Sequence, residues 1–239
     1  NSFSLAASDL APWSADREGT EVEVTIRAAD AYNNPVRDGT IANFRTESGS
    51  IEPTCSTVGG ACTVIWVSQD PRPDSIDVES VITAYTEGEE YLQADLNANG
   101  LMDIGEPFEP LPEVFEDING DNRYDTTAGL NGFDEYIDFN ENGVYDKENN
   151  LFDGLRCSEA AIAAGHCANT IQVRDSVFLC IAGGIPEFTN EFADDNSYKF
   201  TLTDQYGNSL PSGTVISVGV ENGEITGGVT EFGPFETQA

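Results

Sequence analysis

The chain has 239 residues, and its 43 acidic against 10 basic side chains give a formal net charge of −33. A polyanion of this size repels nucleic acids and anionic lipids, so neither is an expected partner, whereas cations are. No apolar run reaches the roughly 20 residues of a membrane helix, so membrane insertion is not expected either. Hydrophobic residues make up 39% of the chain, enough for a buried core.

Short segments of residues 1–87 show the alternation of polar and apolar side chains that is typical of half-buried β-strands. Glu21–Arg27 alternates in this way, and Thr40–Thr46, Thr63–Val67 and Ser80–Tyr85 read as further strands. Turns rich in Gly, Asn and Pro separate them. The pattern predicts an all-β fold built as a β-sandwich.

Five cysteines form two close pairs and one single residue. Cys55 lies near Cys62, Cys157 lies near Cys167, and Cys180 sits alone in an apolar run. Short loops closed by paired cysteines predict two disulfides and an oxidising, extracellular or cell-surface location. Cys180 is expected to be a buried free thiol. Zinc is not favoured, because there is no Cys-x-x-Cys and only one histidine.

Two parts of the chain that lie 174 residues apart share one pattern. Asp30–Thr40 reads DAYNNPVRDGT and Asp204–Thr214 reads DQYGNSLPSGT. A register held over about fifty residues predicts one repeat unit followed by the opening of a second. The same offset aligns further residues without a gap: Ser2 with Ser176, Leu5 with Leu179, and Pro12 with Pro186.

The first unit contains the run VEVTIRAADAYNNPVRDGTIANFRTESGSIEP, followed by CTVIWVS and SVITAYTEG. These motifs resemble the bacterial immunoglobulin-like (Ig-like) domain of the invasin and intimin type. The resemblance covers most of residues 2–87, and its first half returns in 175–225. It implies an Ig-like β-sandwich, which in that family is a rigid spacer in a surface-exposed rod or an adhesive tip.

This sequence departs from the family pattern by a long insertion before the closing strand. The predicted division is an Ig-like sandwich over 1–87 that closes near 170–174, an acidic insert over 88–169, and the first part of a second Ig-like domain over 175–239. The opening of the second domain lacks its closing strands, so strand donation between chains is one alternative that we keep open.

The insert repeats an oxygen-rich pattern three times. The spacing fits an EF-hand-type loop, in which alternate side chains, one main-chain carbonyl and a closing carboxylate supply the six to eight hard oxygens of Ca²⁺ at about 2.3–2.6 Å. Gly100 permits the sharp turn of the first loop. Positions 1, 3, 5, 7, 9 and 12 of that loop are Asp95, Asn97, Asn99, the carbonyl of Leu101, Asp103 and Glu106.

The other two loops lack an acid at position 12, where Ala128 and Asn149 stand. Their closing ligand is missing or comes from another acid; a distant one is considered for the second loop, and Glu148 and Asp153 lie near the third. The predicted ligands of the second loop are Asp117, Asn119, Asp121, the carbonyl of Arg123 and Asp125. Those of the third are Asp138, Asn140, Asn142, the carbonyl of Val144 and Asp146.

Between Glu87 and Asp153 there are nine aspartates and ten glutamates against two cationic residues. Such a segment repels itself, so bound calcium is expected to couple to its folding. The alternatives are a disordered acidic linker and a dockerin-type module. A dockerin needs a helix after each loop, and three prolines follow the first loop. Ser158–Gly165 reads as a short helix between Cys157 and Cys167.

No catalytic site is expected, and His166, the single histidine, reads as an exposed loop residue. The predicted function is a structural or adhesive module of a long bacterial cell-surface or secreted repeat protein, with calcium as cofactor and neighbouring Ig-like repeats as partners. The alternatives are a module that binds a surface protein or glycan, a dockerin-like accessory of a secreted hydrolase, and a filament subunit that self-associates by strand donation.

Overall fold

The computed structural model describes residues 2–70, 72, 79–126, 134–194, 197–219, 221 and 231–233. Nearly all of the regular structure in these residues is antiparallel β-sheet, which confirms the all-β prediction. Within these ranges the one helix is α1 (Glu159–Ala163), and no helix is long and apolar enough to span a membrane.

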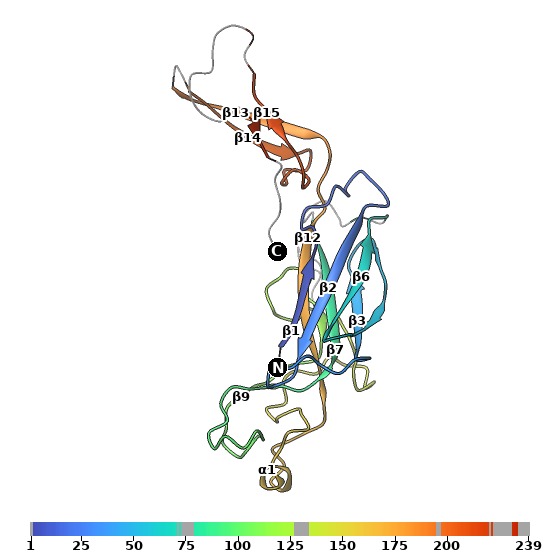
Figure 1. Ribbon diagram of the computed structural model, residues 1–239, viewed down its shortest axis with the longest axis vertical. Coiled ribbons are helices and arrows are strands. Elements are labelled where there is room, and N and C mark those ends of the chain that lie inside the picture. Colours follow the sequence, from blue (N-terminus) through green and yellow to red (C-terminus); the bar gives the residue numbers. More distant parts are fainter. Residues whose placement is uncertain are drawn as a thin grey trace.

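Two four-stranded antiparallel sheets form the centre of the molecule, which we call the two-sheet body (Figure 1). In the second sheet two neighbouring strands come from distant parts of the chain, because the whole insert lies between them in the sequence. The first sheet has the order β1 (Ser2–Ala7), β2 (Glu21–Ala29), β6 (Ala61–Val67) and β4 (Ser50–Ile51). The second has the order β12 (Ile171–Cys180), β7 (Glu79–Gly88), β3 (Ile41–Thr46) and β5 (Thr54–Ser56).

The hydrophobic core lies between the two sheets because each strand turns every second side chain inward. Strand β2 buries Val22, Val24 and Ile26, and the residues between them are more exposed. Phe44 of β3 and Leu179 of β12 belong to the same buried cluster. Burial of each such side chain stabilises the fold by roughly 1.5–3 kcal/mol.

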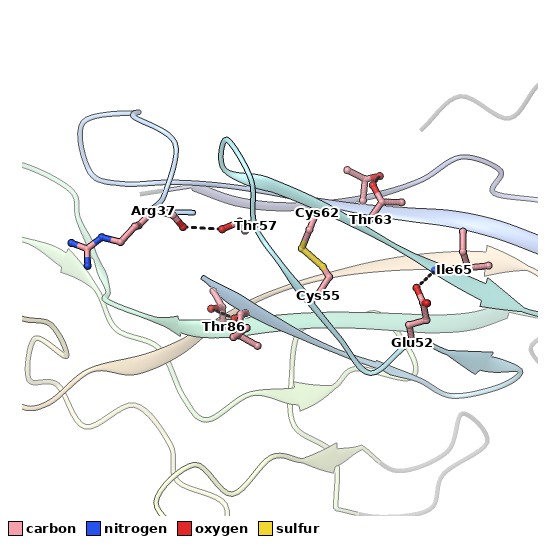
Figure 2. Close-up of a disulfide and its surroundings, with 10 residues drawn as sticks. Arg37, Glu52, Cys55, Thr57, Cys62, Thr63, Ile65 and Thr86 are labelled. Atoms are coloured by element: carbon pink, nitrogen blue, oxygen red, sulfur yellow. Dashed lines mark hydrogen bonds between the residues drawn. A yellow bond between two sulfur atoms is a disulfide. The ribbon is translucent and has the colours of Figure 1, made fainter. Parts of the chain in front are cut away.

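A disulfide between Cys55 and Cys62 joins the two sheets, since Cys55 lies on β5 and Cys62 on β6 (Figure 2). The second predicted disulfide, Cys157–Cys167, is also present. Cys180 is free, as predicted, but it is half-buried and not fully buried.

Strand β12 closes the two-sheet body and is longer than predicted. It pairs with β7 over its whole length, from Ile171 opposite Gly88 to Cys180 opposite Glu79. The expected closing strand near 170–174 is therefore only its first half. The predicted boundary at 175 lies inside the strand.

The second unit begins after β12, at the end of the two-sheet body opposite the insert (Figure 1). Glu187 lies opposite Thr203 as Ser2 lies opposite Ala29, so β13 takes the place of β1. The gapless alignment of Ser176 with Ser2 is thus wrong in this part, because the β13–β14 connection is shorter than the β1–β2 connection. The paired strands are β13 (Pro186–Asp194) with β14 (Ser197–Asp204), and β15 (Ile216–Ser217) with β16 (Glu231–Phe232).

The insert is folded and has short sheets of its own. Its helix α1 has the predicted N-cap, Ser158, whose side chain accepts from the Ala161 N–H, and it follows none of the three loops directly. Among the described residues, then, the helices that a dockerin requires are not found. The small sheets pair β8 (Tyr91–Leu92) with β9 (Phe108–Glu109), and β10 (Phe115–Glu116) with β11 (Glu135–Tyr136).

Candidate metal-binding loops

Three segments of the insert share one tightly curled backbone: loop 1 (Asp95–Glu106), loop 2 (Asp117–Asp125) and loop 3 (Asp138–Asp146). In each loop the residues at positions 4 and 6 have positive φ. A non-glycine residue rarely adopts such a φ, so its recurrence at the same positions identifies the loops as one motif. The pairs are Ala98 (58°) and Gly100 (78°), Gly120 (70°) and Asn122 (60°), and Glu141 (59°) and Gly143 (81°).

The same hydrogen bonds hold each curl. In loop 1 the N–H groups of Asn99 and Gly100 donate to the two carboxylate oxygens of Asp95, at 3.1 and 2.6 Å. The Leu101 N–H donates to Asn99 Oδ1 at 2.7 Å. Loops 2 and 3 repeat all three bonds at the same positions. The side-chain oxygens at positions 1 and 5 are therefore fixed by the backbone.

The acid at position 9 gathers the amide side chains. Asp103 Oδ2 accepts from Nδ2 of Asn97 and of Asn99, each at 2.7 Å, and loop 3 shows the same arrangement around Asp146. A side-chain hydrogen bond with Ser158, followed by those with the two asparagines, lowers the pKa of Asp103. The carboxylate thus stays ionised at neutral pH.

Loop 1 is closed by Glu106, as the sequence predicts. Its two carboxylate oxygens accept the N–H of Leu96 at position 2 (2.7 Å) and of Asp103 at position 9 (2.8 Å). The side chain is buried. One carboxylate therefore ties the two ends of the curl together.

Loops 2 and 3 are closed in the same way by acids from outside their own sequence. Asp134 accepts the N–H of Ile118 (3.0 Å) and of Asp125 (2.8 Å) in loop 2. Glu113 accepts the equivalent N–H groups of loop 3, those of Phe139 and Asp146, both at 3.0 Å. Both acids are buried.

The two closing acids are exchanged between the loops. Glu113 lies four residues before loop 2 and closes loop 3, whereas Asp134 lies four residues before loop 3 and closes loop 2. Antiparallel pairing of Phe115 with Tyr136 in β10 and β11 brings the two loops together. Loops 2 and 3 are therefore one unit, in which neither loop is complete without the segment that precedes the other.

Sequence reasoning missed Glu113 and Asp134 as site residues, although acids before each loop were visible. The nearby acids that it considered do not close loop 3, since Glu148 is exposed and Asp153 accepts from Asn149. Ala128, at position 12 of loop 2, lies outside the described residues. The signal was an acid four residues ahead of a loop, but only the β10–β11 pairing shows which loop it reaches.

A fourth carboxylate clamp joins residues that do not form a complete loop. Glu90 accepts the N–H of Leu111 (2.7 Å) and of Asp153 (3.0 Å) and is fully buried. Burial raises the pKa of Glu90 to about 7. Asn150 has φ 59°, as at position 6 of the loops, but Tyr145 and Lys147 stand where positions 1 and 3 would be. This half-loop, residues 149–153, has Asn149 and Asp153 at positions 5 and 9 but no carboxylate or amide side chain at positions 1 and 3.

An aromatic cluster forms the core between loops 2 and 3. The residues at position 8, Tyr124 and Tyr145, stack with ring centroids 3.9 Å apart, and Phe115 and Tyr136 pack edge-on against Tyr145. Burial raises the pKa of Tyr145 to about 12. The insert is thus not a disordered acidic linker, because it has an apolar centre of its own.

Two arginines attach this core to the two-sheet body. Arg174 of β12 lies 3.7 Å from the ring centroid of Phe115 and donates to its carbonyl at 2.6 Å. Arg45 of β3 lies 3.9 Å from Glu116 and 3.7 Å from Glu135. Contacts with both β12 and β3 therefore fix the position of loops 2 and 3 on the two-sheet body.

Loop 1 is attached differently, through the second disulfide. Its position-8 residue, Met102, forms an isolated parallel β-bridge with Cys157 through the main chain. Phe152 of the half-loop forms a second such β-bridge with Cys167. Both Met102 and Phe152 are buried. The Cys157–Cys167 disulfide consequently holds loop 1 and the half-loop side by side.

In the described residues, no group of three or more His, Cys, Asp or Glu side chains is placed to hold a metal ion. The case for an ion therefore depends on the complete oxygen set of each loop, which includes asparagine amides and a main-chain carbonyl. Carboxylate, amide and carbonyl oxygens are the ligands that Ca²⁺ takes. The chemistry of this donor set fits a hard cation.

Comparisons of the chain with protein-family models, with curated proteins and with solved structures give no match.

Proposed function

We propose that the chain is a calcium-stabilised structural module of a bacterial cell-surface or secreted repeat protein. The observation that carries the proposal is the threefold recurrence of one curl, each closed by a buried carboxylate on the N–H groups of positions 2 and 9. Recurrence of the whole curl, with its oxygen-bearing side chains at positions 1, 3, 5 and 9, supports a common ligand over a chance effect of acidic composition.

In this proposal each loop offers side-chain oxygens at positions 1, 3, 5 and 9, a carbonyl at position 7 and a closing carboxylate. Calcium supplies positive charge and six to eight coordination positions for such oxygens. The proposed set is Asp95, Asn97, Asn99, Leu101, Asp103 and Glu106 in loop 1. It is Asp117, Asn119, Asp121, Arg123, Asp125 and Asp134 in loop 2, and Asp138, Asn140, Asn142, Val144, Asp146 and Glu113 in loop 3.

The proposal assigns the two-sheet body to the Ig-like sandwich of the invasin and intimin type. The core between two antiparallel four-stranded sheets and the motifs of the Asp30–Thr40 turn support this assignment. A repeat of the turn in the second unit supports an array of such modules. Two disulfides support an extracellular location, where calcium is millimolar.

Calcium acts in this proposal by removing the self-repulsion of the acidic insert and so stiffening one end of the body. At 2 mM calcium, a site with a dissociation constant of about 10⁻⁴ M stabilises the fold by about 1.8 kcal/mol, and three such sites by about 5 kcal/mol. For a chain of this size the melting temperature then rises by roughly 10–20 °C.

Thermal unfolding in calcium and in EDTA tests the proposal. Calcium is expected to raise the melting temperature by the amount above, and Glu106→Gln to remove about a third of that gain. Glu109→Gln is the matched control, because Glu109 is an exposed acid of the insert outside the loops. Identical melting curves in calcium and EDTA would contradict the proposal.

A second candidate function is adhesion through the insert. The insert exposes large apolar side chains: Leu96 and Ile104 in loop 1, Val144 in loop 3, and Leu155 between loop 3 and α1. Exposed apolar side chains that adjoin one another are typical of binding surfaces. Calcium-dependent binding to a panel of surface proteins and glycans, lost on substitution of Leu155 by Ser with no change in melting temperature, would establish this function.

A further inference from the structure

The two units meet at a joint with defined hydrogen bonds. The N–H of Gly183 donates to Oδ2 of Asp204 at 2.7 Å, and Asp204 is fully buried. The N–H of Ser212 donates to the carbonyl of Ala11 at 3.0 Å. The joint is thus built from three segments, namely the connector 182–185, the loop 9–16 between β1 and β2, and the loop 204–214 after β14.

The loop Asp30–Thr40 has the same internal geometry as the loop 204–214. Oδ1 of Asp30 accepts the N–H groups two and four residues later at 2.8 and 2.9 Å, and Asp204 does the same at 2.9 and 2.8 Å. The closing threonine hydroxyl donates three residues back in both loops, at 2.8 and 2.6 Å. The first unit therefore carries the same docking geometry as the second.

The Asp30 and Asp204 loops differ in the group that donates a hydrogen bond to Oδ2 of the aspartate. Asp204 is buried and receives the connector through Gly183, while Nδ2 of Asn208 is buried without a hydrogen-bond partner among the described residues. Asp30 is exposed, and its Oδ2 accepts instead from Nδ2 of Asn34 at 3.2 Å. The Asp30 loop thus has the same conformation as the Asp204 loop. The amide of Asn34 takes the place that the Gly183 N–H has at Asp204.

We propose that the Asp30–Thr40 loop is a docking surface for a second copy of the first unit. The copy is one whose connector leads directly into residue 2 of this unit, because in the chain itself the connector and the 9–16 loop are already bound by the 204–214 loop. It would contribute its connector to Asp30 and its 9–16 loop to the rest of the surface. A largely apolar cavity of about 270 Å³ borders the loop and is lined in part by Phe3, Val36 and Val173.

The position of this surface suits a linear array. Because β2 runs antiparallel to β1, the Asp30 loop lies at the end of the two-sheet body away from the joint (Figure 1). A surface at one end that binds a segment from the other end is a head-to-tail contact, which propagates into a line of copies. The insert lies at the same end, and Tyr32 touches Gly100 of loop 1, so loop 1 forms a rim of the surface.

One residue makes docking here weaker than in the joint. In the joint the Ser212 hydroxyl donates to Asp9 at 2.7 Å. The counterpart of Ser212 in the first unit is Asp38, which would face the carboxylate of the docked Asp9 and repel it. The main-chain contacts to Asp30 and to residue 38 do not depend on this side chain.

A tandem protein, residues 1–185 followed by the full chain, tests the proposal by disulfide trapping. It carries Asp9→Cys in the leading copy and Asp38→Cys in the trailing copy, with Cys180→Ser throughout. The positive control is the single chain with Asp9→Cys and Ser212→Cys, whose side chains are in contact. The negative control moves the trailing cysteine to Glu23, which lies at the other end of β2.

The tandem cross-link is expected to form within about tenfold of the positive-control rate, because both are intramolecular contacts at high effective concentration. The cross-link is expected both in calcium and in EDTA, because the contacts with Asp30 do not include an ion. A chain that does not bind calcium and a chain that does not dock therefore give different results. A folded tandem protein that forms no cross-link while the positive control does, or that forms it equally with Glu23→Cys, would overturn the proposal.

Discussion

The exchange of closing acids between loops 2 and 3 can be tested with one substitution, Glu113→Gln. Its carboxylate accepts two backbone N–H groups of loop 3 at 3.0 Å. A glutamine keeps one acceptor oxygen and turns an NH₂ group toward the other N–H. Loss of one charge-assisted bond and weakening of the second costs about 2–4 kcal/mol, with one N–H left unpaired. The melting temperature should fall by roughly 5–15 °C.

Amide hydrogen exchange, measured by mass spectrometry, shows which loop the substitution destabilises. Although Glu113 precedes loop 2, its substitution should speed exchange in residues 138–146 first. Asp134→Asn should give the opposite pattern, with residues 117–125 exchanging faster. Glu148→Gln, which removes an exposed charge beside loop 3, should change neither. Faster exchange of loop 2 alone in Glu113→Gln would refute the exchanged closure.

Three further outcomes are expected. Burial raises the pKa of Glu90 to about 7 from 4.5, so its protonated form stabilises the fold fully below pH 4.5; this contribution of about 3 kcal/mol is lost as the pH rises through 7. Urea unfolding in EDTA between about pH 5 and pH 8, compared with Glu90→Gln, measures it. Replacing Cys157 and Cys167 by Ser should cost about 3 kcal/mol and speed hydrogen exchange in loop 1 more than in loops 2 and 3. A Cβ at Gly184 would overlap the indole of Trp13, which belongs to the 9–16 loop of the joint, so Gly184→Ala should shift tryptophan emission to longer wavelength, whereas Gly219→Ala, with open space around it, should not.

Local patterns predicted much of the first unit. The alternation in Glu21–Arg27 places Val22, Val24 and Ile26 in the core because strand side chains alternate between faces. Both disulfides, the N-cap of α1 and the position of Glu106 also follow from short-range spacing. In each case the residues that interact lie close together in the sequence.

Pairings between distant segments could not be predicted in the same way. The offset of 174 places residues 176–180 at the start of the second unit, but they pair with β7 and complete the first. The second unit instead starts its sheet with β13, because its first connection is shorter. Glu113 was invisible as a loop 3 residue for a related reason, since only the β10–β11 pairing carries it there.

The insert combines a high negative charge with several buried carboxylates. In its described residues, five of them each accept two backbone N–H groups: Glu90, Glu106, Glu113, Asp117 and Asp134. Hydrogen bonds to N–H groups offset part of the cost of burying a carboxylate. The remaining repulsion among so many acids is what a bound cation would remove. Stability of the insert is therefore expected to depend on ionic conditions far more than that of the two-sheet body.

Calorimetric titration of the chain with Ca²⁺, with Mg²⁺ as the control, tests the central claim most directly. The account predicts binding of three calcium ions with dissociation constants of about 10⁻⁴ M or below, with the loop 3 site weakened in Glu113→Gln and the loop 2 site weakened in Asp134→Asn. Magnesium should bind weakly, because it requires a smaller octahedral shell. No heat of calcium binding, or equal binding of both ions, would contradict the account.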